Sequence, residues 1–399
     1  MAEHPSTTSA SHSQQSVPDF VELNDLISNR IGGKILFATD DWFAVAENLL
    51  NPEPAQWKEG EFTKYGKWMD GWESRRKRIA GHDWCIIQLG ISGLIHGVDV
   101  DTSYFTGNYA PRISIQAACL GDDIVFPKRT ATMGSAASDK DKTEIEKMGI
   151  NEWEDIVEVT PLQPGYKDTC HNYFTVNSTK RWTHLRLNMY PDGGIARLRV
   201  YGEAVPNWSK VSPHQLTNLV AVENGGVCLG YSDVHFGHAR NLLTLPRSLT
   251  MADGWETARR LDRPAILEAD NHGVLKVQGW EWAVFRLGHQ GCIKRIEIDT
   301  NHFKGNYPDS CSIEGCIMSS ANEKRCHAYR SGKTRGDFSD CMWTVILPPS
   351  KLSAHNQHFY ESTVVDVGPV THVRLIMRPD GGISRMRLWG YIHKIAAKM

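Results

Sequence analysis

Short apolar runs and strict alternation, rather than the longer period of a helix, dominate the pattern of this chain. Residues 84–90 and 282–288 are apolar runs that end at glycine, which predicts buried strands. Residues 94–102 alternate between apolar and polar side chains, as a half-buried strand does. Helices are few, and the clearest one is predicted at 138–148, where an acidic segment follows a capping serine or aspartate.

Two strand-like runs, 183–190 and 195–201, flank a Pro-Asp-Gly-Gly sequence. Asp-Gly is a strong turn signal because glycine adopts positive φ without steric cost, so the two runs predict a β-hairpin. The strand period of two places His184 and Arg186 on one face of the first run and the leucines on the other.

The chain carries this pattern twice. The segment 184–202 recurs as 372–390 with 12 of 19 positions identical, and three further blocks recur in the same order. We therefore predict a tandem duplication, with repeats at 25–205 and 223–393 and a linker at 206–222. A parallel α/β sheet would need a helix after nearly every strand. The expected fold class is therefore all-β, a jelly-roll sandwich repeated twice with few short helices.

Composition limits the partners of the chain. The 44 Lys and Arg residues balance 46 Asp and Glu residues to a net charge of −2, which argues against nucleic-acid binding. No apolar run reaches the roughly 18 residues that a membrane span needs, so no membrane partner is expected. Nine cysteines without a signal peptide or a CxxC pair favour free thiols. The polar segment 1–22 predicts a disordered tail, and 394–399 form a C-terminal tail.

Several long blocks, in the right order and in both halves, resemble the allantoicase (allantoate amidinohydrolase) family. The resemblance covers essentially everything after the N-terminal tail. It implies a pair of jelly-roll modules of galactose-binding-like type, hydrolysis of allantoate to ureidoglycolate and urea in uric-acid breakdown, and a homo-oligomer. Its carriers include the segments 32–50, 68–78, 82–90 and 98–108 and both Pro-Asp-Gly-Gly-Ile segments.

Cleavage of allantoate, which carries a carboxylate and two ureido groups on one carbon, requires a general acid and a general base. Asp101 and its copy Asp299 are candidates for the base. His184 and its copy His372 are candidates for the acid. The structural alternatives are that the aspartates cap tight turns and that the histidines belong to an exposed polar face.

Candidate substrate-binding residues supply cations for the carboxylate and hydrogen-bonding groups for the ureido groups. Structural alternatives apply here too, since a Glu–Arg ion pair could pin a loop beneath Trp72 or Trp255. Because ligand sites favour junctions, we expect one active site per chain, where the repeats or the subunits meet. The candidates are Glu73, Arg76, Asn108 and Arg186 in the first repeat and Glu256, Arg259, Asn306 and Arg374 in the second.

A metal requirement stays open. His235 and His238 form an H-x-x-H sequence that the first repeat lacks, and Asp40 or Asp233 could ligate calcium. No cofactor is established by the sequence, although a divalent metal is compatible with it. Nucleophile-elbow, P-loop and dinucleotide-binding motifs are absent, which argues against serine hydrolases, NTPases and dinucleotide enzymes.

Two other functions remain alternatives to hydrolysis. A non-catalytic jelly roll could bind carbohydrate on some of the 13 tryptophans, or the chain could be a vestigial allantoicase-like protein. The last three residues, Ala397, Lys398 and Met399, resemble a peroxisomal address, so we predict a cytoplasmic or peroxisomal location.

Overall fold

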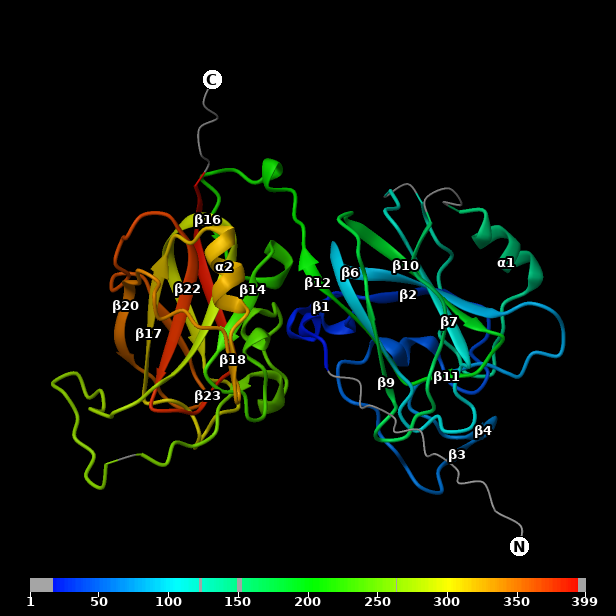
Figure 1. Cartoon of the computed structure of the whole chain (residues 1–399), viewed down its shortest axis with the longest axis horizontal. Coiled ribbons are helices and arrows are strands. Elements are labelled where there is room, and N and C mark those ends of the chain that lie inside the picture. The colour runs from blue at the N-terminus through cyan, green and yellow to red at the C-terminus, as the bar shows by residue number, and fades with distance from the viewer. Residues whose placement is uncertain (1–16, 122–123, 149–152, 263, 394–399) are drawn as a thin grey trace, which may run out of the picture.

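Two β-sandwiches lie side by side along the long axis of the molecule (Figure 1). This computed structural model describes residues 17–121, 124–148, 153–262 and 264–393. Strands far outnumber helices in both sandwiches, which confirms the predicted all-β duplicated jelly roll. None of the described helices is long and apolar enough to cross a membrane.

The first sandwich is organised around one long strand, β6 (Asp83–Asp101). Its first part pairs with β10 and β2, and its last part pairs with β12 and β9, so β6 belongs to both layers. The two strands predicted at 84–90 and 94–102 are therefore one element. The other strands of this sheet are β1 (Asn24–Asp25), β2 (Lys34–Ala38), β7 (Arg112–Ala118), β8 (Glu154–Pro161), β9 (His171–Thr175), β10 (Trp182–Tyr190) and β12 (Arg197–Ala204).

The second sandwich repeats this plan around β16 (Glu281–Asp299), which pairs with β22 and β14 at one end and with β24 and β21 at the other. Its sheet begins at β13, inside the stretch interpreted as a linker. The further strands are β13 (Thr217–Asn218), β14 (Val227–Tyr231), β17 (Ser310–Cys316), β18 (Arg330–Ser331), β19 (Thr334–Arg335), β20 (Thr344–Lys351), β21 (Gln357–Tyr360), β22 (Val370–Arg378) and β24 (Arg385–Ile392).

Short elements complete the two sandwiches. Three small ladders pair β3 (Phe62–Thr63) with β4 (Gly66–Lys67), β5 (Trp72–Glu73) with β11 (Gly194–Ile195), and β15 (Trp255–Glu256) with β23 (Gly382–Ile383). The 3-10 helices are η1 (Asp19–Glu22), η2 (Asn29–Ile31), η3 (Ala46–Leu50), η4 (Trp208–Lys210), η5 (Val222–Asn224), η6 (Ala239–Leu243) and η7 (Met251–Asp253).

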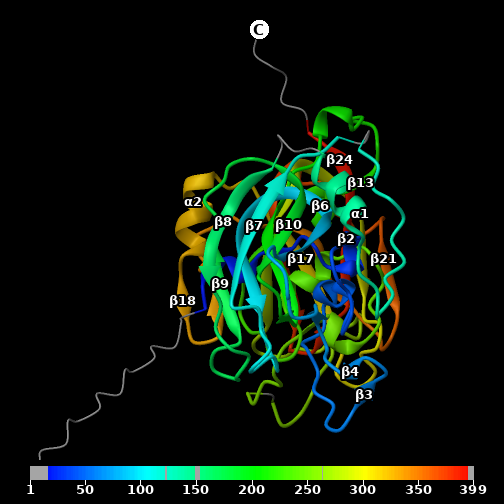
Figure 2. The same ribbon diagram turned by 90° about the vertical axis from the view of Figure 1, so that its right-hand side faces the viewer.

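The two α-helices of the described chain, α1 (Asp139–Glu146) and α2 (Ser320–His327), lie on opposite flanks when the molecule is seen along its long axis (Figure 2). The helix predicted at 138–148 is confirmed as α1. Its N-terminal cap is Ser138, one of the two residue types expected from the sequence, and Asp141 completes a capping box that was not predicted from the sequence.

The predicted hairpin is wrong. β10 and β12 do not pair with each other, because each pairs with a different part of β6 in a different layer. The Pro-Asp-Gly-Gly segment instead crosses from one layer to the other. Its backbone groups bind other loops: Gly193 O accepts from Ser74 N at 3.1 Å, and Gly194 N donates to Asn108 O at 2.8 Å. Gly193 has a φ of 134°, which explains the glycine at this position.

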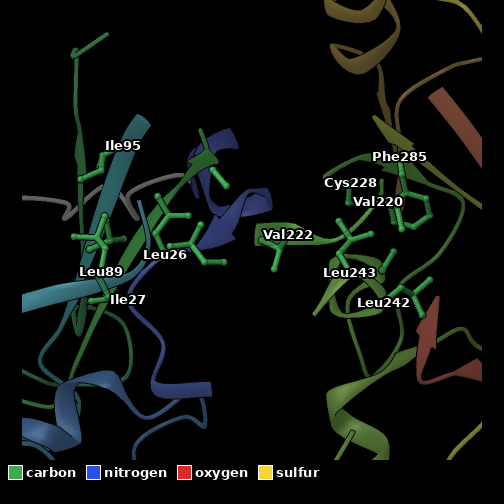
Figure 3. Packing of buried hydrophobic residues seen from close by; sticks show 14 of the residues in the cluster. Leu26, Ile27, Leu89, Ile95, Val220, Val222, Cys228, Leu242, Leu243 and Phe285 are labelled. Atoms are coloured by element: carbon green, nitrogen blue, oxygen red, sulfur yellow. The ribbon is translucent and has the colours of Figure 1, made fainter. Parts of the chain in front are cut away.

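One continuous hydrophobic core extends from the first sandwich into the second (Figure 3). Leu26 and Ile27 come from the first repeat, Val222 lies at the junction, and Leu242 and Leu243 come from the second repeat. All five side chains are at most 3% exposed. The repeats therefore form one packed body rather than two modules on a flexible tether.

The N-terminal segment differs in part from the predicted disordered tail. Residues 1–16 lie outside the described part of the chain, but residues 19–22 form η1. Glu22 explains this order, because its carboxylate binds His238 Nε2 at 2.7 Å and Tyr231 Oη at 3.0 Å in the second repeat. All nine cysteines are free, as expected.

Candidate active site

A glutamate–asparagine pair, in which the glutamate is buried and the asparagine half-buried, lies at one end of the second sandwich. Glu256 follows Trp255 on β15, and Asn306 lies in the loop after β16. Asn306 Nδ2 donates a hydrogen bond to Glu256 Oε1 at 2.6 Å. Trp255 anchors the short strand, since its ring is fully buried and its Nε1 donates to Asp233 O at 2.9 Å. The glutamate is thereby held in place by its neighbour in the sequence.

A cavity of about 310 Å³ opens beside this pair. Its wall combines two carboxylates, an amide, an imidazole and a guanidinium, which are the groups that a polar substrate with a carboxylate and ureido groups requires. Among the described residues, none forms a hydrogen bond or ion pair with the exposed Arg259 side chain. Arg259 is therefore available to a ligand. The polar lining residues that matter here are Glu256, Asn306, Arg259, His235 and Asp380.

The first repeat keeps the same pair. Asn108 Nδ2 donates to Glu73 Oε1 at 2.7 Å, and the ring of Trp72 is fully buried with its Nε1 bound to Asp40 O at 2.8 Å. Burial raises the pKa of Glu73, and the hydrogen bond from Asn108 opposes this rise only in part. Arg76, the counterpart of Arg259, is exposed. Four of the predicted binding residues thus form two matched pairs, and both buried tryptophans serve as anchors.

Asp101 and Asp299 lie elsewhere, at the ends of β6 and β16. Asp101 accepts a hydrogen bond from Ser103 N at 2.7 Å, and Asp299 accepts one from Asn301 N at 2.9 Å. Both aspartates therefore close the turn that follows their strand, which is the structural alternative considered from the sequence. Asp299 also forms an ion pair with Arg247 at 2.8 Å. Neither aspartate lines the cavity beside Glu256.

His184 and His372 occupy equivalent buried positions on β10 and β22 rather than an exposed face. Burial lowers the pKa of His184 to about 4, and its ring lies 6.0 Å from that of Phe126 in a separate cavity of about 560 Å³. His372 Nε2 binds Glu323 Oε2 at 2.9 Å. The structure does not bring either histidine to a Glu–Asn pair.

Arg186 and Arg374 follow these histidines and are occupied by protein partners. The guanidinium of Arg186 lies 4.1 Å from the ring centroid of Trp84. Arg374 Nε donates to Glu314 Oε2 at 2.8 Å, and its guanidinium lies over Trp343. Stacking and ion pairing on the strand surface account for both arginines.

The H-x-x-H sequence does not form a metal pair. Both nitrogens of His238 are used, because Nε2 binds Glu22 and Nδ1 accepts from Arg240 N at 3.0 Å. His235 instead lines the cavity beside Glu256. The H-x-x-H pattern marks His235 only as a metal candidate, because its position in the cavity depends on the fold. Asp380, in the second Pro-Asp-Gly-Gly segment, is the other lining residue that was missed.

The fold and the site define a class: duplicated jelly-roll proteins in which each repeat carries a hydrogen-bonded Glu–Asn pair, and the pair of the second repeat borders a small polar cavity. A model of the allantoicase repeat matches residues 24–205 and 217–393. This chain belongs to the allantoicase family.

Individual relatives cover nearly the whole chain. A probable allantoicase of Pseudomonas fluorescens SBW25 is 40% identical over 375 residues, which are 94% of this chain and 98% of the relative. A probable allantoicase of Pseudomonas syringae B728a is 40% identical over 373 residues, with 94% and 97% covered. The crystal structure of allantoicase from Saccharomyces cerevisiae is similar over 92% of this chain and 93% of that one, with 33% identity and a TM-score of 0.66.

Proposed function

We propose that this protein hydrolyses allantoate to ureidoglycolate and urea, and that the reaction takes place in the cavity beside Glu256. Family membership supports the reaction. The observation that supports the place is the gathering of Glu256, Asn306 and Arg259, all predicted from the sequence as substrate-binding residues, around one cavity. The reaction consumes one water, breaks one C–N bond and transfers a proton to the departing nitrogen.

Each group in the cavity has a role in this scheme. The free guanidinium of Arg259 binds the substrate carboxylate through two parallel hydrogen bonds. Asn306 and Glu256 together offer a donor and an acceptor to a ureido group. Glu256 takes a proton from a water molecule while this water attacks the central carbon of allantoate. His235 protonates the departing urea nitrogen. Cleavage then leaves a hydroxyl group on the carbon, which gives ureidoglycolate.

The duplication provides a matched test of the site. Urea release from allantoate is measured for the wild type, for Glu256→Gln and for Glu73→Gln, which makes the same change in the first repeat. Loss of a general acid–base group lowers kcat by about 10²–10⁴-fold, so this loss is expected for Glu256→Gln only. Loss in Glu73→Gln alone would move the site to the first repeat. Full activity of both variants would overturn both assignments.

Controls separate hydrolysis from the two alternative functions. Folding of each variant is checked by circular dichroism, and the assay is repeated with a chelator. No urea release from a folded wild-type chain would refute hydrolysis, and glycan-array binding would then distinguish a carbohydrate-binding jelly roll from a vestigial protein. Activity lost to the chelator and restored by a divalent ion would add a metal to the reaction.

Assembly and location are part of the same proposal. We propose a homo-oligomer, supported by the family resemblance and tested by light scattering of the purified chain. A peroxisomal location is supported by Ala397, Lys398 and Met399, which lie outside the described residues. Deletion of these three residues from a fluorescent fusion should then move it from peroxisomes to the cytoplasm. An unchanged distribution would leave the cytoplasm as the location.

A further inference from the structure

Three side chains with metal-ligating atoms meet where β6 ends and β9 begins. Asp101, Cys170 and His171 each offer one ligand atom, and these atoms all lie within 4.8 Å of one another. Strand register explains the meeting, because Asp101 and His171 are direct cross-strand partners and Cys170 precedes His171. None of the three residues belongs to a Glu–Asn pair, and the cluster has no part in the proposed hydrolysis.

The histidine is already oriented for a metal. Asp99, two residues before Asp101 on the same face of β6, binds His171 Nδ1 at 2.8 Å. This contact leaves Nε2 as the ring nitrogen that Asp99 does not occupy. A metal-bound histidine usually has such a carboxylate on its other nitrogen, which fixes the tautomer and the ring orientation. Tyr173 lies nearly parallel to the His171 ring, at 5.9 Å between centroids. The ring is thus held from two sides.

We propose that Asp101, Cys170 and His171 form a site for a zinc-class divalent ion, with Asp99 as the orienting carboxylate. One thiolate, one imidazole and one carboxylate suit zinc, which prefers tetrahedral nitrogen, sulfur and oxygen ligands. Ligands at zinc distances stand about 3.6 Å apart, so the cluster must contract by about 1 Å at most. The side chain of His171 is 49% exposed, which leaves the fourth position to water.

The local charge also favours a cation. Asp99 and Asp101 place two carboxylates beside the imidazole and the thiol. One oxygen of Asp99 is buried without a hydrogen-bond partner.

The second repeat shows what the same place looks like without such a site. In the first repeat, Asp101 pairs with His171 across the strands, whereas in the second repeat Asp299 pairs with Gln357. The residue before Gln357 is Asn356, which therefore takes the position of Cys170. Arg247 neutralises Asp299 through two hydrogen bonds, at 2.8 and 3.3 Å. Asp101 forms no ion pair with a lysine or arginine of the described chain. The first repeat has therefore kept the carboxylate and placed a thiol and an imidazole beside it.

Cobalt binding tests the site, because Co²⁺ replaces zinc and shows thiolate coordination as a near-ultraviolet charge-transfer band. The chelator-treated full chain is titrated with Co²⁺ alone. We expect one equivalent to bind with this band, Zn²⁺ to displace it, and Cys170→Ser to abolish it. Asp99→Asn should weaken binding by about 10–100-fold. Cys119→Ser, which removes an exposed thiol of the same repeat, serves as the control and should bind as the wild type does.

Two results would overturn the site. One is a folded wild type that binds no Co²⁺ or binds it without the thiolate band. The other is a band that persists in Cys170→Ser, which would place the thiolate at another cysteine. Thermal unfolding of the metal-free variants is recorded alongside, and His171→Asn provides a second variant if Cys170→Ser fails to fold. Neither result depends on allantoate turnover, so failure here and failure of the proposed function are distinguishable.

Discussion

Adding one methyl group at Gly382 is a stringent test of how the site is held. Gly382 pairs with Glu256 across the β15–β23 ladder. A Cβ atom at this position would lie 1.9 Å from Phe303 Cε1. Carbon atoms in contact stand about 3.5–4.0 Å apart, so the ring or the ladder must move by about 1.5 Å. Phe303 is fully buried and cannot turn away into solvent.

The magnitude follows from two opposing effects. Overpacking a core of this kind costs about 1–3 kcal/mol, while Gly→Ala stabilises by about 0.4–1 kcal/mol through the unfolded chain. We expect Gly382→Ala to lose about 1–2 kcal/mol of unfolding free energy. With a urea m-value of about 2 kcal/mol/M, the unfolding midpoint falls by about 0.5–1 M. A shift of about 1 Å at Glu256 would lower kcat/KM by about 10²-fold.

Matched glycines make this prediction refutable. A Cβ atom at Gly305, in the wall of the same cavity, would meet nothing within 4 Å, so Gly305→Ala should keep the wild-type midpoint. Gly194 is the first-repeat counterpart of Gly382, and its Cβ would lie 2.1 Å from Phe105. Gly194→Ala should lose stability and keep its activity per folded molecule. Equal midpoints for Gly382→Ala and Gly305→Ala would refute the packing argument.

Three further outcomes can be measured. The pKa of His184 is about 4 in the folded protein and about 6.5 in the unfolded chain. The contribution of neutral His184 to the free energy of unfolding is therefore complete above pH 6.5, and about 3 kcal/mol of it is lost as the pH falls through 4. His184→Asn should flatten this part of the urea-unfolding profile, and an unchanged slope would contradict the burial argument. Arg259→Gln should raise KM for allantoate with little change in kcat, because uniform binding is lost; steady-state kinetics will show this, and an unchanged KM would exclude a carboxylate contact. Ser138→Ala removes the capping box and should cost about 0.5–2 kcal/mol, which hydrogen exchange in α1 would detect as faster opening, with Thr130→Ala as a surface control.

Local patterns predicted the elements well and their partners poorly. The alternation in 183–190 correctly predicts that Leu185 and Leu187 are buried, and Ser138 correctly predicts where α1 begins. The Pro-Asp-Gly-Gly segment led to the wrong prediction of a hairpin. Its residues show that the chain changes direction, but they do not determine which strand the following strand pairs with. The partners of β10 are β6, about a hundred residues earlier, and β7, about seventy residues earlier, and no local signal carries either pairing.

The candidate site could be predicted as a set of residues but not as an arrangement. Glu256 and Asn306 are 50 positions apart, and only the return of the chain after β16 brings them within 2.6 Å. His184 and Asp101 were equally plausible from residue type, since an imidazole or carboxylate in a recurring block is compatible with both catalysis and structure. Burial and hydrogen-bond partners distinguish these roles, and both depend on the tertiary fold.

The duplication also separates two reasons why a residue recurs. Asp101 and Asp299 recur because each strand needs a carboxylate to accept the backbone N–H of the turn that follows it. No such backbone requirement applies to Glu256, because within the described part of the chain its side chain accepts its hydrogen bond from the amide of Asn306. A buried carboxylate whose partner is another side chain costs desolvation free energy that an apolar residue would avoid. Its presence beside a cavity is therefore better explained by a ligand than by the stability of the fold, and this argument selects Glu256 over Asp299 as the first residue to mutate.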